Sequence, residues 1–291
     1  MKKIVYLFAA GAIAFASCKK ATDPSPTSTT AGTASADSAS SLSKKHKTTG
    51  SGGTTTTGSG STGSTTTGSS TGTTTTATSL GTFAKVAVYK SGTTFYYTTG
   101  MTIDADGAYK AYNKNDAIAL DYLSDGGVPG DWWALATDAN GNPIIQGATD
   151  PAPGYYVSMT SLADESVSQN SPYAYVDAAS IPYIVLPPNL EKAGGAKLGD
   201  FVAVYNAANG KVSYAIFADE GPNNHLGEGS IALANNLTIN SSAKTGGADS
   251  GIHYVIFPGS GNGKKRTAAD IATNGQALFT AWGGVNKLLG K

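Results

Sequence analysis

The sequence predicts a mainly β fold: a single compact β-barrel with a few short helices. Three observations support this prediction. Short runs rich in Val, Ile, Tyr and Phe recur from residue 81 onward, Gly-containing turn pairs separate them, and no long helices alternate with them. Parallel sheets need such crossover helices, whereas short strands joined by tight turns are typical of closed or nearly closed sheets.

Ten runs have the composition of strands: 83–90, 93–99, 117–123, 131–138, 143–147, 155–162, 181–187, 200–206, 211–219 and 252–258. Glycine-containing pairs between consecutive runs predict hairpins, because glycine adopts a positive φ at little cost: Ser91-Gly92, Asn140-Gly141 and Asn209-Gly210. Two helices are also expected. Ser230 is placed to cap a helix over 230–237, and residues 267–289 are partly helical with an interruption at Gly275.

The N-terminus has the order of a signal peptide. Lys2 and Lys3, an apolar stretch over 4–15 and a small-residue pair precede Cys18, the only cysteine of the chain. The apolar stretch is too short to span a bilayer as a mature helix. The boundary resembles a bacterial lipobox, which implies lipidation at Cys18. An ordinary secretory signal is the alternative.

The expected organisation is a signal peptide at 1–18, a disordered Ser/Thr/Gly-rich linker at 19–80 and a catalytic domain at 81–291. The linker has too little apolar surface to offset its ordering entropy. Acidic residues outnumber basic ones after residue 80, which argues against a nucleic-acid partner. We expect an exported monomer, at the cell envelope or outside the cell, that meets the membrane only through an N-terminal lipid anchor.

Two carboxylates dominate the stretch VSYAIFADEGPNNHLGEGSIALA at 212–234. A strand-like run leads Asp219 into a Gly/Pro/Asn turn, and Glu228 follows nine residues later between two glycines. Such a pair can break a glycosidic bond, one acid protonating the leaving oxygen while the other handles water. Repulsion from Glu220 favours Asp219 as the acid, and the helix start favours Glu228 as the base. Alternatively, Asp219 only forms a turn and Glu228 only begins a helix.

This stretch resembles the signature of glycoside hydrolase family 75, the chitosanases, at Ala218-Asp219 and Gly227-Glu228-Gly229-Ser230. Further blocks match in the same order, at 95–107, 155–162 and 175–187, so that the resemblance covers 83–260. It implies inverting endo-hydrolysis of β-1,4-linked glucosamine polymers, with Asp219 and Glu228 as the essential carboxylates. Thr102 departs from the pattern, because many relatives carry a third acid there.

A shorter resemblance concerns the fold. Residues 198–222 look like double-psi β-barrel proteins, in which an Asp-x-Gly-Pro turn lies at a sugar-binding groove. The turn Asp219-Glu220-Gly221-Pro222 fits that pattern. The resemblance therefore implies a double-psi β-barrel-like domain.

Four residues are candidates for substrate binding. Asp104 and Asp106 would hold the ammonium groups of chitosan, Trp132 would stack on a sugar, and His225 lies in the turn between the two acids. Trp132 and Trp133 point to opposite faces of a strand, so at most one reaches the cleft.

No cofactor or metal is expected. The Asp-x-Asp-Gly string of residues 104–107 lacks the remaining ligands of a calcium loop. Two histidines without a cysteine make no zinc cluster in the domain, and His253, in an apolar strand, is expected to be structural.

Two other functions remain open on the sequence alone. One is a non-catalytic cell-envelope glycan-binding barrel that keeps the motif as a binding turn. The other is a peptidoglycan-active barrel enzyme, which would act on N-acetylated glycan strands.

Overall fold

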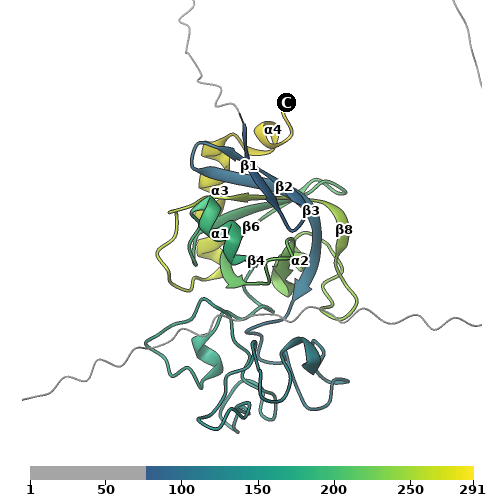
Figure 1. Cartoon of the computed structure of the whole chain (residues 1–291), viewed down its shortest axis with the longest axis vertical. Coiled ribbons are helices and arrows are strands. Elements are labelled where there is room, and N and C mark those ends of the chain that lie inside the picture. Colours follow the sequence, from purple (N-terminus) through teal and green to yellow (C-terminus); the bar gives the residue numbers. More distant parts are fainter. Residues whose placement is uncertain (1–76) are drawn as a thin grey trace, which may run out of the picture. The chain divides into compact units, whose positions relative to one another are not determined.

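The computed structural model describes residues 77–291. Eight strands lie in this part of the chain: β1 (Thr78–Phe83), β2 (Val86–Ser91), β3 (Thr94–Asp104), β4 (Tyr183–Leu186), β5 (Phe201–Asn206), β6 (Lys211–Glu220), β7 (Glu228–Ser230) and β8 (Ala248–Ile256). They form one sheet in the order β1-β2-β3-β7-β4-β6-β5-β8, and β3 also pairs with β8. Six strands therefore close into a barrel, and β1 and β2 extend it as a hairpin (Figure 1). This confirms the predicted mainly β barrel.

Inward-facing side chains fill the barrel. Phe95, Tyr97, Phe217 and Tyr254 are each no more than 1 % exposed, and the rings of Tyr97 and Tyr254 stack with their centroids 4.8 Å apart. Burying an apolar side chain of this size stabilises the fold by about 1.5–3 kcal/mol. The predicted signal peptide, Cys18 and the predicted linker up to residue 76 lie outside the described residues. Residues 78–80, which belong to the predicted linker, are instead the first part of β1.

Four short helices accompany the barrel: α1 (Pro188–Gly194), α2 (Ile231–Asn236), α3 (Ala268–Trp282) and α4 (Gly284–Leu288). As predicted, Ser230 caps α2, because its side chain accepts a hydrogen bond from the backbone N–H of Leu233. None of the helices in residues 77–291 has the length and apolar character that crossing a bilayer requires.

The predicted interruption at Gly275 is wrong, because α3 runs through that residue to Trp282 and is capped by Gly283. Gly275 lies against β6, where an added Cβ would come within 2.6 Å of the Tyr214 Cβ. This glycine therefore serves close helix–sheet packing rather than a break.

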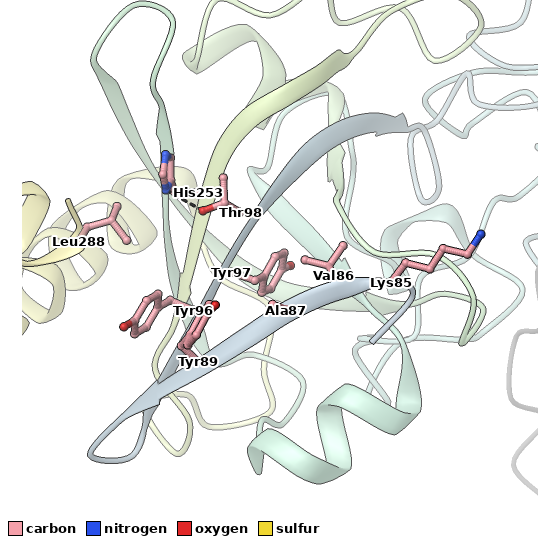
Figure 2. Close-up of a pocket in the computed structure, with 9 residues that line it drawn as sticks. All are labelled: Lys85, Val86, Ala87, Tyr89, Tyr96, Tyr97, Thr98, His253 and Leu288. Carbon is pink, nitrogen blue, oxygen red and sulfur yellow. Dashed lines mark hydrogen bonds between the residues drawn. The ribbon is translucent and has the colours of Figure 1, made fainter. Parts of the chain in front are cut away.

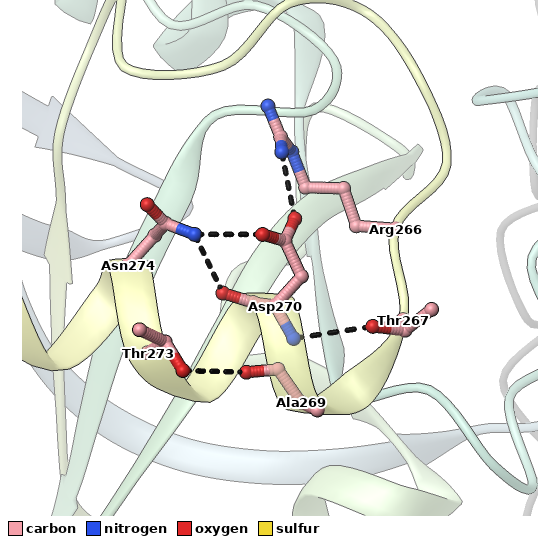
Figure 3. A network of polar contacts seen from close by, with 6 residues as sticks. All are labelled: Arg266, Thr267, Ala269, Asp270, Thr273 and Asn274. Carbon is pink, nitrogen blue, oxygen red and sulfur yellow. Dashed lines mark hydrogen bonds and ion pairs between the residues drawn. The ribbon is translucent and has the colours of Figure 1, made fainter.

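Polar contacts fix the beginning of α3 (Figure 3). Thr267 caps the helix by accepting from the Asp270 N–H at 3.1 Å, and Asp270 pairs with Arg266 at 2.7 Å. Asn274 donates to the carboxylate of Asp270 at 2.7 Å from the next turn. The anchored helix then covers β5 and β6.

Residues 105–182 join β3 to β4 without a regular strand, and Figure 1 shows them gathered at one end of the barrel. The strands predicted at 117–123, 131–138, 143–147 and 155–162 are therefore wrong. The last three of these runs meet one another one residue pair at a time, so no ladder extends, and residues 117–123 take part in no bridge with them. Side chains satisfy the backbone instead: Gln146, for example, donates to the carbonyls of Tyr109 and Tyr156.

Candidate functional site

The two predicted catalytic carboxylates lie on the strands that flank β4. Asp219, near the end of β6, and Glu228, at the start of β7, are both register partners of Val185. Neighbouring strands are about 4.8 Å apart, so the Cα atoms of the two acids lie about 10 Å apart across β4. Residues in register share a face of the sheet, so both side chains project to the same side.

Both side chains reach one narrow pocket, which has room for about one water molecule. Five carboxylates and three other residues line it: Asp104, Asp106, Trp133, Val185, Asp219, Glu220, Gly221 and Glu228. The parallel pairing of β3 with β7 places Asp104 in register with Ser230, two residues beyond Glu228. Four of these acids are almost completely buried, at 3–9 % exposure: Asp104, Asp106, Asp219 and Glu228.

Asp219 is held through one of its two carboxylate oxygens. Its Oδ1 accepts from the Ser161 N–H at 2.8 Å, the Ser161 hydroxyl at 2.6 Å and the Glu220 N–H at 2.9 Å. These donors favour the anion, but burial and the neighbouring Asp104 oppose it more strongly and raise the pKa of Asp219 to about 8. With Oδ1 accepting three hydrogen bonds, the proton of the neutral acid belongs on Oδ2.

The carboxylate oxygens of Asp104, Asp106 and Asp219 come within 4.8 Å of one another. The Asp106 N–H donates to Asp104 Oδ1 at 2.8 Å, and the Tyr112 hydroxyl donates to Asp106 Oδ1 at 2.5 Å. Three oxygens at this spacing are the kind of donor set that a hard cation takes. Three negative carboxylates at this spacing would repel one another, and a proton shared between them relieves that repulsion. The raised pKa of Asp219 favours such a shared proton.

Two glycines lie next to Glu228. Gly221 lies beside this carboxylate, and a Cβ on Gly221 would come within 3.0 Å of the Val185 side chain, which also lines the pocket. Gly227 precedes Glu228 with a φ of +103°. Gly227 therefore supplies the backbone conformation that the turn before Glu228 requires.

The substrate-binding candidates are placed differently from one another. Asp104 and Asp106 line the pocket, and so does Trp133 rather than Trp132. Trp132 packs against the hydrophobic cluster beneath. Strand alternation allows only one of two adjacent tryptophans to reach the cleft, and the residue that lines the pocket is Trp133. The predicted candidate, Trp132, does not line it.

His225 does not line the pocket. Its Nε2 lies 2.9 Å from the Thr102 hydroxyl, and the Thr102 N–H donates to the Gly227 carbonyl at 2.9 Å. These contacts tie the turn between the two acids to β3. His225 therefore helps to position Glu228 from outside the pocket.

Sequence reasoning missed two residues that act on the site. Ser161 supplies two of the three hydrogen bonds to Asp219, and its place in the block at 155–162 is the one signal that pointed to it. Glu191 of α1 is the other. Burial, and then the adjacent Glu220, raise the pKa of Glu191 to about 7, so a second carboxyl pair lies at the pocket edge.

Comparison with known proteins identifies one family. The family model described as fungal chitosanase of glycosyl hydrolase group 75 matches residues 133–283, about half of the chain. The match begins and ends later than the resemblance at 83–260, and it includes Asp219 and Glu228 but neither Asp104 nor Asp106. No curated protein matches the chain.

Proposed function

The chain belongs to glycosyl hydrolase group 75, the fungal chitosanase family, and on that premise we propose that it cleaves internal β-1,4 bonds of chitosan with inversion. Membership makes it a glycoside hydrolase of the chitosanase type. The observation that carries the finer proposal is the pairing, in one pocket, of Glu228 with an Asp219 whose pKa is raised.

In the proposed reaction, Asp219 is the general acid. It is neutral at pH values below about 8, and its Oδ2 proton passes to the glycosidic oxygen as the C1–O bond breaks. Glu228 takes a proton from a water molecule whose oxygen attacks C1 from the opposite face. Inversion requires that the two carboxyl groups stand far enough apart to leave room for this water, about 6.5–9.5 Å.

Substrate binding requires the pocket to widen, because a sugar ring is much larger than a water molecule. Trp133 lines the pocket from the irregular segment, where its indole N–H donates to the Asp125 carbonyl at 2.8 Å. Four acidic residues besides the protonated Asp219 line the pocket, and this acidic lining favours a cationic substrate such as glucosamine.

The test uses soluble chitosan and the purified full-length protein. We expect a rapid fall in viscosity with slow release of reducing ends, since internal cleavage shortens chains before it produces many ends. Proton NMR of the first products is expected to show the α-anomer, as inversion at a β bond requires.

Other outcomes would replace this proposal. Unchanged viscosity with retained binding would favour the glycan-binding barrel. Cleavage of acetylated glycan strands alone would favour the peptidoglycan-active enzyme. A β-anomer among the first products would contradict inversion and imply a covalent intermediate.

We also propose that the chain is exported and anchored by a lipid on Cys18, as its position after the apolar stretch supports. Cells fed a labelled fatty acid are expected to label the wild-type protein and not a Cys18→Ser variant. Equal recovery of both proteins in the soluble fraction would contradict the anchor and leave an ordinary secretory signal.

A further inference from the structure

A second pocket, of about 380 Å³, lies on the outer face of the sheet (Figure 2). The β1–β2 turn, strands β2, β3 and β8 and helix α4 provide its lining: Lys85, Val86, Ala87, Tyr89, Tyr96, Tyr97, Thr98, His253 and Leu288. Volumes in this range are typical of small-molecule sites. Thr98 and Asp104 are six residues apart on β3, or about 20 Å along the strand, so this pocket is separate from the catalytic one.

Strand alternation explains the hollow. Ala87 and Tyr89 are exposed on β2, and the register places Tyr89 opposite Tyr96 and Thr98 opposite His253. These five side chains share the outward face. Ala87 is the smallest of them, and it leaves a gap between its larger neighbours.

One wall of the pocket is an aromatic platform. The rings of Tyr89 and Tyr96 stack with centroids 5.9 Å apart, and Tyr96 packs edge-on against Trp282 at 5.7 Å. Tyr89 is 44 % exposed although its ring is held by Tyr96. A rigid tyrosine ring with an exposed part offers a large apolar contact area at a small entropy cost, as stacking against a sugar ring needs.

The polar groups around the platform suit a neutral ligand. The Thr98 hydroxyl and His253 Nδ1 are 2.8 Å apart, and His253 Nε2 makes no hydrogen bond within residues 77–291. Burial lowers the pKa of His253, so its ring is neutral near pH 7. No carboxylate lines this pocket, whose one charged lining residue is Lys85. The second pocket is thus lined by a positive charge, whereas the catalytic pocket is lined by acidic residues. It does not favour binding of an ammonium group such as that of glucosamine.

We propose that this pocket is a second glycan-binding site that takes a neutral pyranose, such as an N-acetylglucosamine unit. Eight of its nine lining residues lie outside the segment 133–283 that matches the family model, His253 being the exception. The site is therefore built mainly by parts of this chain that the family match does not cover. It goes beyond the proposed hydrolysis, because binding here needs no turnover.

Binding is measured with the full-length protein carrying Glu228→Gln, so that no substrate is cleaved. Calorimetric titration with the N-acetylglucosamine tetramer is expected to show binding that Tyr89→Ala weakens about tenfold, a loss of about 1.4 kcal/mol. Tyr122→Ala is the matched control, because Tyr122 is also 44 % exposed but lies outside the pocket. Titration with the glucosamine tetramer is expected to give the same affinity with and without Tyr89→Ala.

A second variant covers the case in which Tyr89→Ala perturbs the hairpin. Ala87→Trp is expected to fill the gap on an exposed position and to weaken binding of the acetylated tetramer similarly, with an unchanged circular dichroism spectrum. Unaltered affinity in both variants would overturn the proposal, and so would a parent protein that does not bind the acetylated tetramer. Neither result depends on whether the wild-type protein hydrolyses chitosan.

Discussion

Replacing Asp219 by Asn is expected to abolish hydrolysis of chitosan while the protein stays folded. The amide keeps the shape of the carboxyl group and cannot donate the proton that the leaving oxygen needs. Loss of a general acid lowers the rate by about 10²–10⁴-fold. Reducing-end release near pH 6, where Asp219 holds its proton, measures the effect.

The same substitution is expected to stabilise the protein, relative to the wild type, as the pH rises. An unfolded Asp titrates near pH 3.9, whereas burial and Asp104 raise the native pKa of Asp219 to about 8. Between these values the native state holds a proton that the unfolded chain has lost, so wild-type stability falls by about 1.4 kcal/mol per pH unit. This contribution is fully present below about pH 4 and is lost as the pH approaches 8. The amide of the Asp219→Asn variant does not titrate. Urea unfolding at pH 4, 6 and 8 is therefore expected to show that the free energy of unfolding of the variant increasingly exceeds that of the wild type.

Glu165→Gln is the control for this experiment. Glu165 is exposed and lies outside the pocket, so its substitution removes one acidic charge without touching the site. We expect wild-type activity and a wild-type pH dependence of stability. Substantial activity in Asp219→Asn would refute the acid role, and an unchanged pH slope would show that Asp219 is ionised in the native protein.

The strands of the barrel could be predicted because they carry their own signal. The runs at 200–206 and 211–219 combine β-branched and aromatic residues with a glycine turn, and they form β5 and β6. The run at 131–138 has a similar composition but finds no partner for a ladder, so it stays irregular. Strand β7 shows the reverse case: Glu228–Ser230 has no strand composition, and it is a strand because β3 and β4 pair with it on both sides.

The site was predictable only where its residues are close in sequence. Asp219 and Glu228 stand nine residues apart in one recognisable stretch, and the structure places both in one pocket. The approach of Asp104 to Asp219 depends on barrel closure, because it requires the parallel register of β3 with β7. Ser161 reaches Asp219 from 58 residues away. Spacing along the chain contains no information about such long-range contacts.

Gly227→Ala is expected to cost about 3 kcal/mol of stability or more, and to remove activity from the protein that remains folded. Gly227 has a φ of +103°, which side chains rarely adopt and which alone costs about 1–3 kcal/mol. A Cβ there would lie 2.5 Å from Thr99 Cγ2 and 2.7 Å from the Gly100 carbonyl oxygen. The side chain of Thr99 can rotate away, but the backbone oxygen belongs to β3 and cannot. The turn must therefore shift, and Glu228, the next residue, shifts with it.

Gly92→Ala separates the two causes of the lost stability, which are the positive φ and the close contact with β3. Gly92 also has a positive φ, +65°, in the β2–β3 turn, but a Cβ there would meet no atom within 4 Å. We expect Gly92→Ala to lose about 1–2 kcal/mol of stability, from backbone strain alone, and to keep full activity. Urea unfolding and chitosan hydrolysis of both variants make the comparison. Equal destabilisation of the two variants would mean that the contact with β3 contributes nothing. Wild-type activity in Gly227→Ala would mean that the position of Glu228 does not depend on this close approach of the turn to β3.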